Sequence, residues 1–555
     1  MYRLKRYGFM FFILCIMGMG MACEPLSEMK ENISEEKERK EIARHAQEVN
    51  EHGFMLIFDE QELFVPAQMS ESMHLLMPIK TAVSTFGVQI MPGEDGLGYV
   101  DGQPVENVII CQNVSDKSKR GTELKQNQIY PENVFVDINR MVSILDFTLD
   151  WNDSAYIMRI QSSDTMELPV RYDLREIRNL NPVDDQGGYG TCWAFASTAA
   201  LEMIPSVDEG VHFSVDHMTM NNGFNISPED GGDYNMAIAY LSAWGGPVSE
   251  AEDPYGDGET NTLLDAEKHL QEAQILKEKD LNKIKQLILT YGGVESPIYM
   301  SISHARDRSE DYEPSKSAYF YSGEAEANHD VVIIGWDDDF SRENFNHVPE
   351  NDGAFICRNS WGEAFGEQGY FYVSYEDRVL GQQTVAYTRL ENPDNYSRIY
   401  QSDMLGWVGT LGYGDESAWF SNVYTSDEDE MLSAVGFYAV DDNSQYDLYV
   451  VQDFDETADL ENGIYMGSGY CENAGYYTVD FPNPVSVKAD EPFAVIVCMT
   501  TRDCERPIAI EYPASELTQG AVIEDGEGYV SYDGTAWASA EQEYACNVCL
   551  KAFTE

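Results

Sequence analysis

The sequence predicts a multidomain protein with small α/β units at the N-terminus, an α+β domain in the middle and an all-β sandwich at the end. Three observations support this prediction. A chain of 555 residues is too long for one hydrophobic core. The pattern of residues 165–391 changes from helical to strand-rich. After residue 394, short alternating segments rich in Tyr, Phe and Val are separated by Gly, Asn and Asp turns, as in a sandwich.

The first 23 residues have the order of a secretory signal, with basic residues, then an apolar run, then small residues. The run from Phe9 to Met21 is too short to span a bilayer comfortably. It ends in GMGMAC, which resembles a bacterial lipobox with Cys23 as the lipidated residue. Gly20 stands where such boxes usually carry Leu, so plain cleavage near residue 23 is the competing interpretation. Both interpretations place the protein outside the cytoplasm, and a lipid anchor at Cys23 would be its contact with the membrane.

Two N-terminal regions precede the middle domain. Residues 24–53 are polar and rich in Glu and Lys, which predicts a solvated helical spacer. Within residues 54–162, the segments 75–90 and 134–151 are each predicted to form a strand, a short helix and a strand. The two segments resemble the stalk-type domain repeated at the front of many bacterial surface proteins. They offer few candidate catalytic residues, so we expect a structural spacer.

The middle domain is predicted at residues 165–391, and the sandwich at 394–555 is predicted to fold separately and to serve binding rather than chemistry. Inside the middle domain, residues 263–293 show helical periodicity with Gly at the end as a stop signal. This pattern predicts a long amphipathic helix.

Charge and cysteine content exclude several classes of function. The chain has 97 acidic and 35 basic residues, a net charge of −62, which repels phosphate backbones and argues against a nucleic-acid partner. Acidic runs at 426–430 and 453–461 lack the ligand spacing of an EF-hand loop. Cys546 and Cys549 form a single C-x-x-C, too little for a zinc site. One or two disulfides in the C-terminal region are compatible with the remaining cysteines, but a disulfide scaffold is not.

Three short motifs carry candidate chemistry. In QGGYGTCWAFAS (186–197), a glycine-rich stretch runs into an apolar segment at Cys192, and a helix beginning there would lower the thiol pKa and favour the thiolate. His329 stands at the head of the apolar strand VVIIGW and offers an imidazole for proton transfer. Asn359 opens the motif NSWG and offers an amide that can orient the imidazole. Each residue alone has a structural explanation, but three such contexts in this order indicate nucleophilic catalysis.

Taken together, these motifs resemble the papain family of cysteine peptidases over residues 165–391. The resemblance implies an α+β papain-like fold with a helical left lobe and a β-rich right lobe. It implies that Cys192 is the nucleophile, His329 the general base and acid, and Asn359 the residue that orients the imidazole. Gln186 would offer its side-chain amide to the oxyanion beside the backbone N–H of Cys192.

The resemblance has further implications. Trp361 would cover the hydrogen bond between His329 and Asn359, and Gly231 and Gly232 would let the substrate backbone approach. Proteins or peptides would be the substrates, and no cofactor or metal is expected. Residues 394–555 resemble the lectin-like domain found behind peptidase domains in bacterial surface proteins, which implies a possible cell-wall or glycan ligand.

The chain departs from the family pattern at two places. Tyr189 and Thr191 stand where the family signature has Cys and a small residue before the nucleophile, so the familiar disulfide cannot form there. His329 lies within the usual spacing of roughly 130–150 residues from the nucleophile, whereas Asn359 lies beyond it because an acidic loop is inserted between them. Neither departure removes a catalytic group.

Two other functions compete with an exported cysteine endopeptidase. The first is a surface adhesin or glycan-binding protein whose peptidase domain is inactive or secondary. The complete set of Cys192, His329, Asn359 and Gln186 argues against inactivity. The second is transglutaminase-like acyl transfer, which also uses Cys and His but usually completes the set with Asp, so the NSWG motif favours a peptidase.

Overall fold

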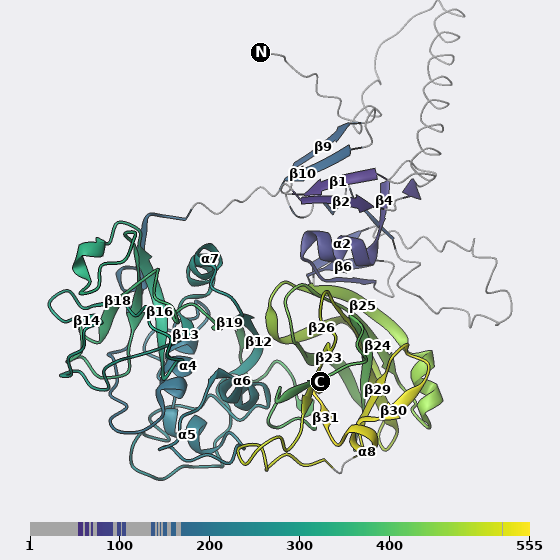
Figure 1. The fold of residues 1–555 in the computed structure, drawn as a ribbon. Helices are drawn as coiled ribbons and strands as arrows, with labels where there is room; N and C mark the ends of the chain where they lie inside the picture. Colours follow the sequence, from purple (N-terminus) through teal and green to yellow (C-terminus); the bar gives the residue numbers. More distant parts are fainter. Residues whose placement is uncertain are drawn as a thin grey trace, which may run out of the picture.

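The structure is a computed structural model that describes residues 54–58, 61–65, 68–69, 75–92, 97–101, 103–106, 135–138, 141–142, 145, 148–152, 157–161, 168–523 and 526–555. The predicted signal (1–23), its Cys23 and the predicted spacer (24–53) lie outside the described residues. Figure 1 shows a central unit of residues 168–391, in blue to teal, beside a sandwich of residues 394–555, in green to yellow. The N-terminal elements lie above the sandwich in this view.

The N-terminal elements follow the predicted order where they are described. Residues 75–90 form β4 (Leu75–Pro78), α2 (Ile79–Phe86) and the start of β5 (Ile90–Pro92). Helix α2 buries Ile79, Ala82, Val83 and Phe86, one face at helical spacing, and ends at Gly87 in the left-handed region. In the second segment β8 (Phe135–Asp137) and β9 (Thr148–Asn152) form the two predicted strands. That the two segments are repeats of one stalk-type domain stays a prediction.

The N-terminal strands belong to three sheets. One sheet has the order β2-β1-β10-β9, a second has the order β3-β4-β8, and β5-β6-β7 extends a sheet of the sandwich by pairing with β25. The other strands of these sheets are β1 (Phe54–Phe58), β2 (Gln61–Val65), β3 (Gln68–Met69), β6 (Leu97–Val100), β7 (Gln103–Glu106), β10 (Ile157–Gln161) and β25 (Ile464–Cys471).

The central unit begins with helices and continues with strands, as predicted. Its helices are α4 (Cys192–Glu202), α5 (Val215–Met220), α6 (Tyr234–Ser242) and α7 (Leu281–Tyr291). Its strands are β11 (Arg171–Asp173), β12 (His269–Leu276), β13 (Val294–Ile298), β14 (Tyr312–Glu313), β15 (Ala318–Tyr319), β16 (His329–Asp337), β17 (Ala354–Arg358), β18 (Tyr370–Ser374) and β19 (Thr384–Glu391). Residues Cys192 to Leu201 of α4 are all buried, because this helix passes through the core.

The predicted long helix at 263–293 is wrong in its first half. Only α7 is helical, and it ends at Gly292 as the stop signal predicts. Residues His269–Leu276 form β12, which is buried on both sides and hydrogen-bonded to a strand on each edge. Pairing on both edges outweighs the high helical propensity of HLQEAQIL, because tertiary context overrides local propensity.

The sandwich packs two sheets around a common apolar core, as predicted. One face is β26-β23-β32-β20 and the other is β30-β29-β22-β27-β24-β25. Core residues such as Phe420, Phe437 and Val497 come from both faces. The bounds are β20 (Arg398–Tyr400), β21 (Gly409–Leu411), β22 (Ser417–Thr425), β23 (Glu430–Ala439), β24 (Ser444–Val451), β26 (Ala474–Val487), β27 (Pro492–Thr501), β28 (Ile508–Glu511), β29 (Gly528–Ser531), β30 (Trp537–Ser539), α8 (Ala540–Tyr544), β31 (Asn547–Val548) and β32 (Leu550–Thr554).

The sandwich is not separate from the central unit. β12 pairs with β19 on one edge and with β26 on the other, so one sheet runs through both units. One apolar cluster holds Ala273 and Ile275 of β12 together with Tyr438 and Tyr476 of the sandwich. Independent folding of the sandwich stays a prediction, and in the structure the sandwich supplies backbone and apolar partners to a strand of the central unit.

Cysteine pairing and membrane spanning can be stated for the described part of the chain. All seven cysteines there are free, so the C-terminal disulfides considered from sequence do not occur. None of the helices among the described residues is long and apolar enough to cross a membrane.

The pairing of β12 with β26 gives the first prediction. Gly475 has a φ of +147°, and a Cβ there would lie 2.0 Å from the backbone oxygen of Ala273. Gly475→Ala should therefore separate β12 from β26 and lower the free energy of unfolding by about 2 kcal/mol. Thermal unfolding measures the effect, with Gly188→Ala as the control because nothing lies within 4 Å of its added Cβ. Equal melting temperatures for both variants and the wild type would contradict the role of this pairing.

Candidate active site

Cys192 is the first residue of α4, as the sequence predicts. Thr191 is the N-cap, and the Cys192 side chain is 9% exposed. The backbone N–H groups at the start of a helix carry partial positive charge, which favours an anion there. The thiol therefore lies where a developing thiolate or an oxyanion is stabilised.

His329 and Asn359 meet at the adjoining ends of two paired strands. His329 opens β16 and Asn359 follows β17, and the distance between His329 Nε2 and Asn359 Oδ1 is 2.7 Å. The backbone N–H of Ser360 also donates to Asn359 Oδ1, at 2.8 Å. Since that N–H can only donate, the amide oxygen faces it, and His329 Nε2 must be the protonated nitrogen. His329 Nδ1 is then left to accept a proton.

Trp361 packs against the imidazole of His329 at a centroid distance of 4.9 Å. Trp361 is 7% exposed, His329 6% and Asn359 3%, so bulk water has little access to their hydrogen bond. Water competes less effectively for the donor and acceptor of a hydrogen bond that is shielded from it. The packing supports the covering role inferred for Trp361.

Gln186 is joined to the NSWG motif by backbone and side-chain bonds. Its N–H donates to the Ser360 oxygen at 2.8 Å, and Asp185 forms a bridge with Trp361. Ser360 Oγ donates to Gln186 Oε1 at 2.7 Å, and Gln186 Nε2 donates to the Tyr189 oxygen at 2.8 Å. The amide is thereby oriented, and one of its two N–H groups is left for a ligand.

Tyr255 is a supporting residue whose role the sequence analysis missed. Its hydroxyl donates to the Gln186 oxygen at 2.9 Å and lies 2.8 Å from Thr191 Oγ1. Because the phenol has one hydrogen, the Thr191 hydroxyl donates to it. Tyr255 thus connects both ends of the glycine-rich loop. Tyr255 belongs to the short segment DPY (253–255), but nothing in the sequence places this segment next to the glycine-rich loop.

The partner of the Cys192 thiol is a residue the sequence analysis did not select. Among the described residues, the side chain that bonds to Cys192 Sγ is Asp330, whose Oδ2 lies 3.7 Å away. Burial raises the pKa of the Cys192 thiol well above its usual range, and the charge of Asp330 raises it further. Burial likewise lowers the pKa of His329 to about 4, against a smaller opposite effect of Asn359.

These directions differ from the lowered thiol pKa expected from the helix start alone. Burial penalises each charge taken singly, and Asp330 adds a negative neighbour. Burial and the charge of Asp330 therefore oppose a free thiolate, and burial opposes an isolated imidazolium.

The two candidate glycines differ in their surroundings. A Cβ on Gly232 would lie 2.4 Å from Trp193 Nε1, so a side chain there cannot be accommodated without movement of the indole. Gly231 is exposed and nothing lies within 4 Å of its added Cβ. Close packing requires a glycine at 232, and open surface at 231 leaves room for a substrate backbone.

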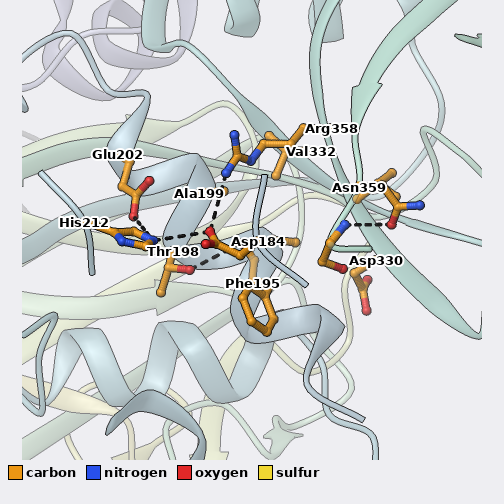
Figure 2. A pocket seen from close by; sticks show the side chains of 13 residues that line it. Asp184, Phe195, Thr198, Ala199, Glu202, His212, Asp330, Val332, Arg358 and Asn359 are labelled. Carbon is orange, nitrogen blue, oxygen red and sulfur yellow. Dashed lines mark hydrogen bonds and ion pairs between the residues drawn. The ribbon is translucent and has the colours of Figure 1, made fainter. Parts of the chain in front are cut away.

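A polar cavity lies behind Asn359, on the side of the charged residues Asp184, Glu202, His212 and Arg358 (Figure 2). His212 Nε2 lies 3.3 Å from Asp184 Oδ2, and this contact raises the pKa of His212. Arg358 donates to the oxygens of Asn181 and Pro182 at 2.6 and 2.7 Å. The cluster fixes the strand end that carries Asn359.

Family profiles match the two large units. The family described as "Papain family cysteine protease" matches residues 168–389, and the "Lectin like domain" family matches residues 399–554. The matches occur in the predicted order.

Curated relatives match the central unit. Zingipain-2 of Zingiber officinale is 30% identical over 214 residues, which is 37% of this chain and 86% of that protein. A viral cathepsin of Heliothis zea nuclear polyhedrosis virus is 24% identical over 303 residues, 52% of this chain and 75% of that protein. Cathepsin L of Sarcophaga peregrina is 29% identical, and the chain spans 59% of its length.

Solved structures of Cwp84 share the fold. The clostridial cysteine protease Cwp84 after propeptide cleavage has a TM-score of 0.62 and 24% identity, and the match covers 69% of this chain and 99% of that chain. The cysteine protease and lectin-like domains of Cwp84, described as a surface layer associated protein of Clostridium difficile, give 0.60 at 23% identity, with 70% and 89% covered. This likeness extends through both large units.

The contact between Cys192 and Asp330 gives the second prediction. Asp330→Asn removes a negative charge that raises the thiol pKa, so alkylation of Cys192 by iodoacetamide should begin at lower pH than in the wild type. Mass spectrometry of the Cys192 peptide measures the rate against pH. Asp265→Asn is the charge-matched control, because Asp265 is exposed. An unchanged or upward-shifted profile for Asp330→Asn would contradict the assignment.

Proposed function

The chain belongs to the papain family of cysteine proteases, and we propose that it is an exported endopeptidase that hydrolyses peptide bonds at Cys192. The observation that carries the proposal is the bond between His329 Nε2 and Asn359 Oδ1, which leaves Nδ1 of a buried imidazole unprotonated. Thiol acylation requires a base of this kind near a thiol at a helix start, and Asp330, which follows His329 in the chain, contacts Cys192 Sγ.

Acylation begins when Cys192 Sγ attacks the carbonyl carbon of the scissile bond. The proton of the thiol passes to His329 Nδ1 as the S–C bond forms, so the imidazolium charge develops together with the negative charge on the carbonyl oxygen. The carbonyl oxygen becomes an oxyanion that accepts the backbone N–H of Cys192 and the free N–H of Gln186. His329 then gives its proton to the amine nitrogen, the C–N bond breaks, and a thioester remains on Cys192.

Deacylation repeats these steps with water as the nucleophile. His329 Nδ1 takes a proton from water as its oxygen attacks the thioester carbon. The C–S bond breaks, the acid product leaves, and the proton returns to Cys192. Asn359 holds the imidazole in one orientation through both halves, and Trp361 shields its hydrogen bond.

Export and surface display form the cellular part of the proposal. The signal-like order of residues 1–23 supports export, and GMGMAC supports lipidation at Cys23. Cwp84, whose domains share this fold, is described as surface layer associated. The lectin-like family match at 399–554 supports a cell-wall or glycan ligand for the sandwich. An adhesin with a secondary peptidase domain is the alternative function.

The third prediction tests the nucleophile and its partners. Cys192→Ala and His329→Ala should abolish hydrolysis of a peptide substrate, because each removes a group that exchanges a proton. Gln186→Ala should lower kcat on the order of 10²–10³-fold as a lost oxyanion donor. Asn359→Ala should have a milder effect, because Asn359 orients a group and exchanges no proton. Steady-state kinetics on the full chain measures kcat and KM for all four variants.

Labelling with an epoxide inhibitor of papain-type enzymes provides the control. The label should map to Cys192 and spare Cys504, a half-exposed free thiol, and Cys504→Ser should label as the wild type does. Peptide hydrolysis by folded Cys192→Ala at the wild-type rate would disprove the proposal and leave the adhesin alternative.

The fourth prediction concerns the anchor. A diacylglyceryl group on Cys23 supplies two acyl chains, enough for stable membrane attachment, whereas one chain binds only marginally. Cells expressing the wild type should retain the protein in the membrane fraction, and Cys23→Ala should release it. Equal solubility of both proteins in the medium would favour plain cleavage near residue 23.

A further inference from the structure

Three carboxyl groups form an acidic line that runs from the surface of the central unit to its core beside Cys192. Asp233, at the N-cap of α6, is exposed. Asp330 is half-buried and contacts the thiol, with Oδ2 3.7 Å from Sγ. Glu295, on β13, is fully buried. All three interact through their charges, since Asp233 raises the pKa of Asp330, and Asp330 and Asp233 both raise that of Glu295.

The inner end of the acidic line has an unused hydrogen-bond acceptor. Glu295 Oε2 accepts from Ser197 Oγ at 2.7 Å and from the Tyr387 hydroxyl at 3.1 Å. Glu295 Oε1 has no partner, although the residue is 0% exposed. A buried carboxyl oxygen without a hydrogen-bond partner is energetically unfavourable. Such an oxygen commonly bonds to a water, an ion or a ligand, or has a functional role.

The described residues supply no cation to the acidic line. None of the described ion pairs involves Asp233, Asp330 or Glu295, and no Lys or Arg contributes to the pKa of either buried carboxyl. The titratable groups that interact with the line are Cys192 of α4, Tyr234 of α6 and Tyr387 of β19, and His329 adjoins Asp330 in the chain. None of these four groups brings a Lys or Arg charge to the line.

We propose that the acidic line is a subsite for the positively charged side chain of a Lys or Arg residue close to the scissile bond of the substrate. The proposal rests on the assignment of Cys192 as nucleophile, because the contact with Asp330 places the line beside the reacting atom. The exposed Asp233 attracts the cation, Asp330 pairs with it, and the free oxygen of Glu295 accepts one of its N–H groups.

Binding of a cation at Asp330 also changes the nucleophile. The carboxylate opposes the thiolate form of Cys192 while it is uncompensated. A substrate cation neutralises it and so favours transfer of the thiol proton to His329. A basic side chain at this position should therefore increase the rate of acylation as well as the affinity for substrate.

The experiment uses fluorogenic peptides in which one position at a time carries Lys, Arg, norleucine or citrulline. At one position near the scissile bond, kcat/KM should be at least roughly tenfold higher for Lys than for norleucine, and for Arg than for citrulline. The ratio should increase from about pH 5 to about pH 8, because the pKa of Asp330 is raised to about 7 by burial and then by Asp233.

Three charge-removing variants test the residues. Asp233→Asn keeps an N-cap acceptor, and Glu295→Gln keeps an acceptor for Ser197 and Tyr387. Each of these and Asp330→Asn should reduce the Lys-to-norleucine ratio toward one, whatever the absolute rate. Asp265→Asn should keep the wild-type ratio. The exposed Asp233 allows a test even where Glu295→Gln fails to fold.

The outcomes separate this proposal from the catalytic one. A wild-type ratio near one at every position, or a ratio that the three variants leave unchanged, would overturn the subsite while peptide cleavage persists. Absence of cleavage of every peptide, with no epoxide label on Cys192, would instead overturn the proposed peptidase function.

Discussion

β12 is hydrogen-bonded along both edges, and this double pairing determines how the two large units meet. Ala273 lies opposite Tyr387 of β19 on one edge and opposite Tyr476 of β26 on the other. Tyr387 is also the residue whose hydroxyl donates to Glu295. Strand β26 of the sandwich pairs with β12, and β12 pairs with β19, whose Tyr387 contacts Glu295 at the inner end of the acidic line. The sandwich and the site are thus connected through the backbone hydrogen bonds of β12.

Helix α6 makes a second connection between the sandwich and the site. It packs on β12, and Ser242 near its end bonds to the Tyr438 hydroxyl of the sandwich at 3.2 Å. Its other end carries Asp233, the outer end of the acidic line. One helix thus spans from the interface between the units to the candidate substrate subsite. Both routes end at carboxyl groups of the acidic line, Glu295 and Asp233.

The family and the order of the two large domains could be predicted from the sequence, and both are confirmed by the matches at 168–389 and 399–554. The helix start at Cys192 and the strand start at His329 were predicted correctly because short, contiguous patterns mark both. β12 failed because its eight residues follow a helical pattern, whereas two partner strands distant in sequence decide its structure. The acidic line was missed for a related reason. Asp233, Glu295 and Asp330 come from three separate elements, and only the tertiary fold brings them together.

The glycine-rich loop is held by hydrogen bonds at the place where the resemblance to the papain family implies a disulfide. Tyr189 stands where the family signature has Cys, and all seven cysteines of the described residues are free. The loop is instead held by the Tyr255 hydroxyl at both ends and by the backbone pairing of Gln186 with Ser360. These bonds form in any redox environment, since none of them requires oxidation of a thiol. Gln186, the proposed oxyanion donor, is therefore positioned by hydrogen bonds of the fold, and reducing agents leave these bonds intact.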